Sequence, residues 1–180
     1  IAGVSDALRA AKIPVFGPSQ KAAQLEGSKS FAKEVMAAAD VPTGMARECE
    51  TIEEVEAAMN DFGAPYVIKA DGLAAGKGVI VTSDREAALD HAKKFIDMGI
   101  LVEEFLDGQE VSLFFLADGQ TVLPLTPAQD FKRIFDGDKG PNTGGMGAYS
   151  PLSWVAKNLE QQVIEHVLQP TINEMARRNQ

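Results

Sequence analysis

The most informative segment of the chain is residues 67–79, which read Val67-Ile-Lys-Ala-Asp-Gly-Leu-Ala-Ala-Gly-Lys-Gly-Val79. It begins with two β-branched residues, and a second β-branched run, Val79-Ile-Val81, follows its glycine-rich centre. Short β-branched runs on either side of a glycine loop are typical of two strands joined as a hairpin. The segment therefore predicts strand, loop and strand.

The loop of this hairpin has the composition of a phosphate-binding loop. It contains three glycines, Gly72, Gly76 and Gly78. Glycines allow backbone conformations closed to other residues, so the loop can turn its N–H groups toward phosphate oxygens. Lys69 and Lys77 frame the loop and add charges suited to phosphate. A hairpin with solvated lysines is the alternative interpretation, but two lysines around so short a loop favour a nucleotide.

The segment does not match the P-loop pattern, and a dinucleotide-binding fold is disfavoured. A P-loop needs four residues between its glycines and a Gly-Lys-Ser/Thr sequence before a helix. Here three residues separate Gly72 from Gly76, and a glycine and a strand follow Lys77. The glycine turn of a dinucleotide-binding fold also opens a helix. A phosphate loop between antiparallel strands indicates a different architecture.

Composition excludes some partners. The chain has 180 residues, enough for one domain or one and a half, and a net charge of −9. This acidity argues against broad nucleic-acid binding, which needs a basic face. No apolar run reaches the length of a membrane span. The chain has a single cysteine, Cys49, which fits a reducing compartment. Cys49 lies between Glu48 and Glu50, and these acidic neighbours argue against a depressed thiol pKa.

The remaining pattern mixes helices and strands. Helices are predicted at residues 4–12, 28–39 and 153–179, the last with a break or kink at Pro170. Capping boxes at Thr51–Glu54 and Ser83–Glu86 predict two further helices. Strands are expected at residues 13–16, 100–106, 111–117 and 121–125. A glycine-rich loop is expected at residues 136–150, and loops of that length are usually functional or disordered.

The central elements give the order β-β-α-β, with the glycine loop between the first two strands. The last of these strands, residues 100–106, is apolar and ends in acidic residues. An adenine needs apolar walls and a strand edge, and a ribose needs a carboxylate. Glu103 or Glu104 near the base and Glu110 near the sugar meet these needs. A strand with a solvated acidic end is the alternative for this segment taken alone.

Four segments together resemble one family. They are Glu26-Gly-Ser-Lys29, the segment 67–79, Val102-Glu-Glu-Phe-Leu-Asp-Gly108 and Gly140-Pro-Asn-Thr-Gly-Gly-Met-Gly-Ala-Tyr-Ser-Pro151. In this order they are similar to the phosphoribosylamine–glycine ligases (glycinamide ribonucleotide synthetases), ATP-grasp enzymes of purine synthesis. The resemblance covers nearly the whole chain, and the last motif is highly specific.

The resemblance implies an α+β ATP-grasp fold, with a β-β-α-β lid and part of the second ATP-grasp subdomain. It divides the chain into the end of an N-terminal α/β domain (1–18), a linker helix region (19–42), the lid (43–116) and part of the catalytic subdomain (117–180). The N-terminal glycine-rich half and the C-terminal metal-binding part of the family are expected outside this segment.

The resemblance also implies site residues. The nucleotide-binding set is Lys29, Lys69, Asp71, Gly72, Gly76, Lys77, Gly78, Glu103, Glu104, Phe105, Leu106 and Glu110. The set on the phosphoribosylamine side is Asp130, Lys132, Arg133, Pro141, Asn142, Thr143, Gly144, Gly145, Met146 and Gly147. Catalytic roles fall to Lys69, Lys132 and Arg133.

The implied reaction joins glycine to 5-phosphoribosylamine with ATP, through a glycyl phosphate. Mg²⁺ is expected as cofactor, with ligands beyond Gln180 that the sequence does not name. A cytoplasmic monomer is expected, and the segment by itself is expected to be inactive. Two alternatives stay open: another ATP-grasp carboxylate–amine ligase, or a nucleotide-binding module without catalysis.

Overall fold

The computed structural model describes residues 2–72, 78–137 and 139–179. The first half contains α1 (Val4–Ala10), α2 (Gln24–Gly27), α3 (Lys29–Ala38), β1 (Ala46–Cys49), α4 (Ile52–Phe62), β2 (Tyr66–Ala70), β3 (Val79–Thr82) and α5 (Arg85–Phe95). The second half contains η1 (Ile96–Met98), β4 (Ile100–Glu103), β5 (Phe115–Ala117), β6 (Val122–Pro124), β7 (Gln129–Phe135), β8 (Lys139–Tyr149), α6 (Leu159–Val163), η2 (Ile164–Leu168) and α7 (Gln169–Arg177).

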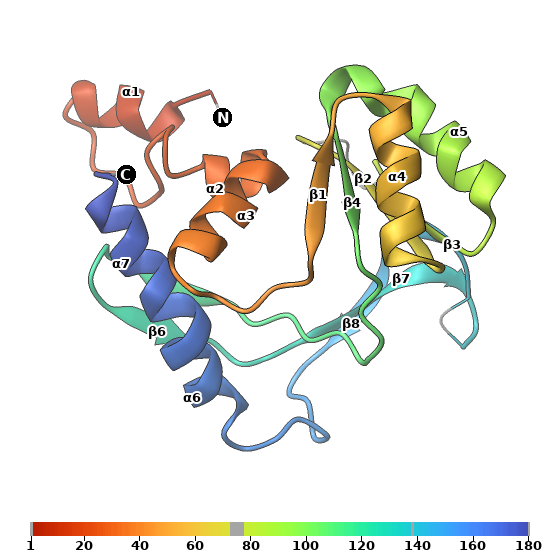
Figure 1. Cartoon of the computed structure of the whole chain (residues 1–180). Coiled ribbons are helices and arrows are strands. Elements are labelled where there is room, and N and C mark those ends of the chain that lie inside the picture. Colours follow the sequence, from red (N-terminus) through yellow and green to blue (C-terminus); the bar gives the residue numbers. More distant parts are fainter. Residues whose placement is uncertain (1, 73–77, 138, 180) are drawn as a thin grey trace.

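An antiparallel sheet forms the centre of the molecule, with strand order β1-β4-β2-β3. β2 and β3 are antiparallel and pair from Tyr66 opposite Thr82 to Lys69 opposite Val79, so the predicted hairpin is confirmed. The predicted β-β-α-β order is confirmed by β2, β3, α5 and β4. β1, which the sequence pattern did not reveal, adds a fourth strand at the edge. Figure 1 shows α4 and α5 on one side of this sheet and α2 and α3 on the other.

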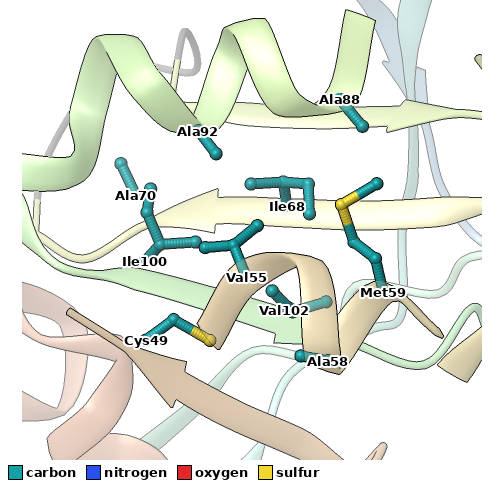
Figure 2. Close-up of a cluster of buried hydrophobic side chains, with 10 residues drawn as sticks. All are labelled: Cys49, Val55, Ala58, Met59, Ile68, Ala70, Ala88, Ala92, Ile100 and Val102. Carbon is teal, nitrogen blue, oxygen red and sulfur yellow. The ribbon is translucent and has the colours of Figure 1, made fainter. Parts of the chain in front are cut away.

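The core lies between the sheet and the helices α4 and α5. Alternate strand residues point to one face, and on this face they are apolar and fully buried, as Ile68 and Val102 are. Figure 2 shows the cluster: Cys49, Val55, Ala58, Met59, Ile68, Ala70, Ala88, Ala92, Ile100 and Val102. The same alternation sends Lys69 of β2 and Glu103 of β4 to the opposite face. Burial, followed by the charge of Glu54, raises the pKa of the Cys49 thiol although Arg47 opposes the shift, which agrees with an unreactive core cysteine.

Both helices over the core begin at a side-chain cap. Thr51 accepts a hydrogen bond from the Glu54 amide while the Glu54 carboxylate accepts one from the Thr51 amide, so the first capping box is confirmed. The second prediction, a box starting at Ser83, is wrong. Asp84 is the cap of α5, because its carboxylate accepts from the amides of both Glu86 and Ala87. A carboxylate that satisfies two free helix amides is a better cap than a hydroxyl one residue earlier.

Several predicted strands are shorter than expected or absent. The segment 13–16 is not a strand, because the Ile13 amide donates to Leu8 as α1 ends and Phe16 is 76% exposed. The strand predicted over 100–106 ends at Glu103, after which the Glu104 side chain turns to the backbone of Met45. The strands predicted over 111–117 and 121–125 shrink to β5 and β6.

The glycine-rich segment 136–150 is mostly a strand, so the prediction of a long loop is wrong. β8 pairs antiparallel with β7, from Gln129 opposite Tyr149 to Phe135 opposite Lys139. The register shifts on both sides of Arg133. Such irregularities take up extra residues within a ladder, and glycines tolerate the positive φ angles that occur here, such as +84° at Gly140.

The C-terminal helix starts later than predicted, at Leu159, and it does not break at Pro170 but passes through a π-helical turn just before it. The π-helical turn η2 precedes α7, and Pro170 occupies the first turn of α7, where a missing N–H costs little. No helix among the described residues is long and apolar enough to cross a membrane.

α7 is fastened to α3 by charged side chains. Arg178 bonds Glu174 of α7 at 2.6 Å and Glu34 of α3 at 2.7 Å, and its guanidinium lies over the ring of Phe31. The Glu174 side chain is only 6% exposed and also bonds Arg177. Hydrogen bonds from Arg177 and then Arg178 lower the pKa of Glu174 to about 2, against the burial that would raise it.

Candidate nucleotide site

A cavity of about 690 Å³ lies between α2, α3 and the face of the sheet opposite the core. Its charged lining comes from four elements: Glu26 on α2, Lys29 and Lys33 on α3, Lys69 on β2 and Glu103 on β4. Apolar lining comes from Leu25, Ala32, Met36, Val79 and Leu106. The volume is within the range of small-molecule sites, and a mostly apolar pocket with a few convergent charges is typical of them.

Glu103 is shared between two lysines in this cavity. Its carboxylate lies 2.8 Å from the ammonium of Lys69 and 3.7 Å from that of Lys33. Lys33 also donates to the Thr43 hydroxyl at 2.8 Å and to the Gly44 carbonyl. The three charged side chains are 12–29% exposed. The whole lining has three lysines, Lys29, Lys33 and Lys69, against the two carboxylates of Glu26 and Glu103, and this net positive charge suits an anionic ligand.

The base of the glycine loop is bound to the start of α3. The Asp71 carboxylate accepts hydrogen bonds from the Ser28 hydroxyl at 3.0 Å and from the amides of Lys29, Ser30 and Gly72. In return, the Lys29 ammonium donates to the carbonyls of Ala70 and Gly72, each at 2.8 Å. Burial would raise the pKa of Asp71, but these hydrogen bonds outweigh it and lower the pKa. Asp71 is therefore ionised at neutral pH.

A second hollow, of about 880 Å³, follows the β7–β8 hairpin. Lys132 is among the residues that line it and pairs with Glu110 and, at 3.1 Å, with Asp130. Burial would lower the pKa of Lys132, but the two carboxylates raise it, so its charge is fixed. Arg133 donates to the Gly140 carbonyl at 3.2 Å, and Thr143 donates to the Lys132 carbonyl.

The structure brings together only part of the predicted nucleotide set. The cavity between α3 and the sheet is lined by Lys29, Lys69, Gly72, Gly78, Glu103 and Leu106. Glu104 instead bonds Met45, and Phe105 is 44% exposed outside this lining. Glu110 lies with Lys132 in the second hollow. Gly76 and Lys77 lie outside the described residues.

The predicted phosphoribosylamine set lies on the β7–β8 hairpin. Asp130, Lys132 and Arg133 on β7 and Met146 on β8 line the second hollow. The segment Pro141–Gly147 forms the middle of β8, where Asn142 pairs with Arg133. Thr143 is held by the Lys132 carbonyl and caps the Gly145 amide.

Sequence reasoning missed Lys33, the second cation beside Glu103. Lys33 follows Lys29 by four residues on α3, and residues four apart share a helix face. That spacing was the available signal. Within the part of the chain that the structure describes, no group of three or more His, Cys, Asp or Glu side chains is placed to hold a metal ion.

The hairpin-bearing sheet, its two helices and the lysine-lined cavity opposite them define an ATP-grasp protein. The family described as phosphoribosylglycinamide synthetase, ATP-grasp (A) domain, matches residues 27–180. The chain belongs to this family.

Known relatives agree with this assignment. The chain is 64% identical over 178 residues to a phosphoribosylamine–glycine ligase of Streptomyces coelicolor, and 62% identical over 177 residues to that of Leifsonia xyli. These matches cover 99% and 98% of the chain but 42% of each relative. The crystal structure of a Thermotoga maritima phosphoribosylamine–glycine ligase superposes with a TM-score of 0.81 at 35% identity, over 91% of this chain and 44% of that one. The chain thus spans less than half the length of these relatives.

Proposed function

We propose that this chain is the ATP-binding portion of a ligase that joins glycine to 5-phosphoribosylamine. In this reaction the glycine carboxylate attacks the γ-phosphate of ATP, displaces ADP and gives glycyl phosphate, and the sugar amine then displaces phosphate to form glycinamide ribonucleotide. The observation that carries the proposal is the cavity lined by Lys29, Lys33, Lys69 and Glu103 in a chain of this family. The relatives that bear the ligase name support the choice of substrates.

The residues of the cavity suit the parts of ATP. Ammonium groups bind phosphate oxygens as charged hydrogen-bond donors, and Lys69 and Lys29 are the nearest to the glycine loop. The apolar side chains Leu25, Met36 and Leu106 offer walls for a purine ring. Phosphoryl transfer depends mainly on positioning and charge neutralisation. In this proposal Lys69 both positions a phosphate and neutralises its charge. Its ammonium exchanges Glu103 for a phosphate oxygen, and Glu103 keeps Lys33 as its partner.

The β7–β8 hairpin suits the phosphorylated sugar. Lys132 and Arg133 offer cationic groups, and glycines on β8 let a ligand approach the backbone closely. Asp130 pairs with Lys132 and holds its ammonium in the hollow. We assign Lys132 and Arg133 to the phosphoribosylamine side on this basis.

Magnesium is proposed as the metal of the reaction. When bound, Mg²⁺ neutralises charge on the ATP phosphates and is held by one or two carboxylates. Its protein ligands are assigned to parts of the complete ligase outside residues 2–72, 78–137 and 139–179. We further propose a cytoplasmic monomer that takes small-molecule substrates and binds neither nucleic acid nor membrane, in keeping with the net charge of −9.

The test is substrate-dependent phosphate release by the full-length protein. With ATP, Mg²⁺, glycine and freshly made phosphoribosylamine, we expect phosphate release and a product with the mass of glycinamide ribonucleotide. Reactions that omit glycine, or replace it with alanine, are the controls. If ATP binds but phosphate is released only with another carboxylate, the chain belongs to a ligase of different specificity. The 180-residue segment assayed alone is expected to give no product.

A further inference from the structure

Asp71 is the most extensively bonded carboxylate near the cavity. It accepts hydrogen bonds from four groups: the Ser28 hydroxyl and the amides of Lys29, Ser30 and Gly72. Three of the donors lie at the start of α3, where helix amides have no partner within the helix. The fourth lies on the first residue of the loop after Asp71.

Lys29 completes the connection in the opposite direction. Its side chain donates to Ala70 and Gly72, the residues on either side of Asp71, while its own amide donates to the Asp71 carboxylate. The Asp71 amide in turn bonds the Gly99 carbonyl at 2.9 Å, which ties the loop base to the start of β4. We name this set of Ser28, Lys29 and Asp71 the clasp. It joins α3, one wall of the cavity, to the hairpin that forms the other.

We propose that Asp71 is a positioning residue, which fixes the base of the glycine loop, at Asp71 and Gly72, relative to α3 through the clasp and so presets the phosphate end of the nucleotide site. The proposal rests on the proposed function and deepens it. Asp71 itself does not contact nucleotide. Its negative charge would repel a phosphate, and its oxygens are occupied by the start of α3 and by Gly72.

If the clasp positions the phosphate end of the site, its loss should weaken the binding of ATP and ADP but not that of adenosine. Gly72 and Lys29 line the cavity beside the loop base, whereas Met36 lies about 10 Å further along α3 and Leu106 packs near Gly44. Loss of the Asp71 carboxylate removes the acceptor of the Lys29 and Ser30 amides and so releases the loop base from the start of α3. ATP and ADP therefore lose affinity, whereas adenosine, which has no phosphate, keeps its affinity.

A matched control is available in Asp84, which also caps a helix with its carboxylate but lies outside the cavity lining. In the full-length protein, Asp71→Ala is expected to weaken ATP binding at least tenfold by calorimetry. Asp84→Ala is expected to change it less than twofold. Adenosine, measured by displacement of a fluorescent nucleotide, should bind within twofold of wild type in both variants.

Two milder variants keep the test decisive if Asp71→Ala does not fold. Asp71→Asn retains an acceptor oxygen but no charge, and Ser28→Ala removes one donor. Each is expected to weaken ATP binding about threefold to tenfold, a range set by the loss of one hydrogen bond. If both bind ATP within twofold of wild type, the clasp has no positioning role.

Three further results would overturn the inference without affecting the ligase assignment. If Asp71→Ala binds ATP with unchanged affinity, Asp71 does not position the nucleotide site. Equal losses for ATP and adenosine would show general damage to the lid. A loss seen only when Mg²⁺ is present would make Asp71 a metal ligand rather than part of the clasp. Failure of the wild-type protein to form product while it binds ATP would instead refute the ligase assignment alone.

Discussion

Replacing Lys69 with methionine tests the proposed nucleotide site most directly. Lys69→Met keeps the length and apolar stem of the side chain but removes the ammonium that lies 2.8 Å from Glu103. The remaining partner of Glu103 is Lys33, at 3.7 Å. Because Glu103 keeps this cation, we expect a modest loss of folding stability, on the order of 1 kcal/mol or less.

The effect on ATP should be larger. A charge-assisted contact to phosphate contributes about 1.5–3 kcal/mol, which corresponds to roughly tenfold to a hundredfold in affinity. The net charge around Glu103 also changes, from two ammonium groups per carboxylate to one. We therefore expect the ATP dissociation constant of Lys69→Met to rise by that factor, and the difference to shrink as ionic strength increases.

The matched control is Lys93→Met, on the outer face of α5. Lys93 is 57% exposed and pairs with Asp90 at 3.5 Å, so the substitution makes the same change in total charge far from the cavity lining. Calorimetric titration of both variants with ATP in the full-length protein, at two salt concentrations, gives the comparison. If Lys69→Met binds ATP as tightly as Lys93→Met does, Lys69 does not contact the nucleotide and our placement of the phosphates is wrong.

Three other predictions concern stability, each measured by urea unfolding. The pKa of Glu174 is lowered to about 2 from an ordinary 4.5, so the stability that its ion pairs contribute should be complete above about pH 4.5 and lost as the pH falls toward 2. Glu174→Gln should flatten this dependence of the unfolding free energy on pH. An unchanged dependence would contradict the pairing of Glu174 with the arginines. Ile68→Ala, in the core, should cost about 2–5 kcal/mol, against about 0.5 kcal/mol or less for Leu123→Ala, which is 59% exposed. Gly140→Ala should destabilise the β7–β8 hairpin by about 1–2 kcal/mol, because φ is +84° and the new methyl group would collide with the Phe135 ring; a neutral result would mean that the strand can shift.

Local signals in the sequence predicted the elements whose causes are local. The β2–β3 hairpin follows from β-branched residues around a glycine loop, and the start of α4 follows from the exchange of hydrogen bonds between Thr51 and Glu54. Lys69 and Glu103 share a face because both strands alternate, so their proximity also follows once the strands are paired.

Elements that depend on distant partners were not predictable in the same way. β8 contains many glycines and a proline, which disfavour a strand by local preference, yet it pairs with β7 through shifted register. β1 is short, and it pairs with β4, which comes much later in the sequence: Ala46 lies opposite Glu103. The pattern and the resemblance place Glu110 near a ribose, which stays a prediction; its pairing with Lys132 was not predictable, because that contact depends on how β7 lies beside residues 108–110.

Strand β4 is the last of the four sheet strands to be synthesised, yet it lies between β1 and β2. β2 and β3 can pair early, as neighbours along the chain. Among the described residues, β4 is the one strand that pairs with β1 in this sheet. The pairing of β1, such as Ala46 opposite Glu103, can therefore form only after β4 has been synthesised. Closing so long a loop is entropically costly and slows folding. During synthesis the sheet is therefore completed late, when β4 inserts between β1 and β2. The same step brings Glu103 of β4 to Lys69 of β2. Until β4 is in place, the cavity therefore lacks Glu103, the carboxylate that pairs with Lys69 and Lys33.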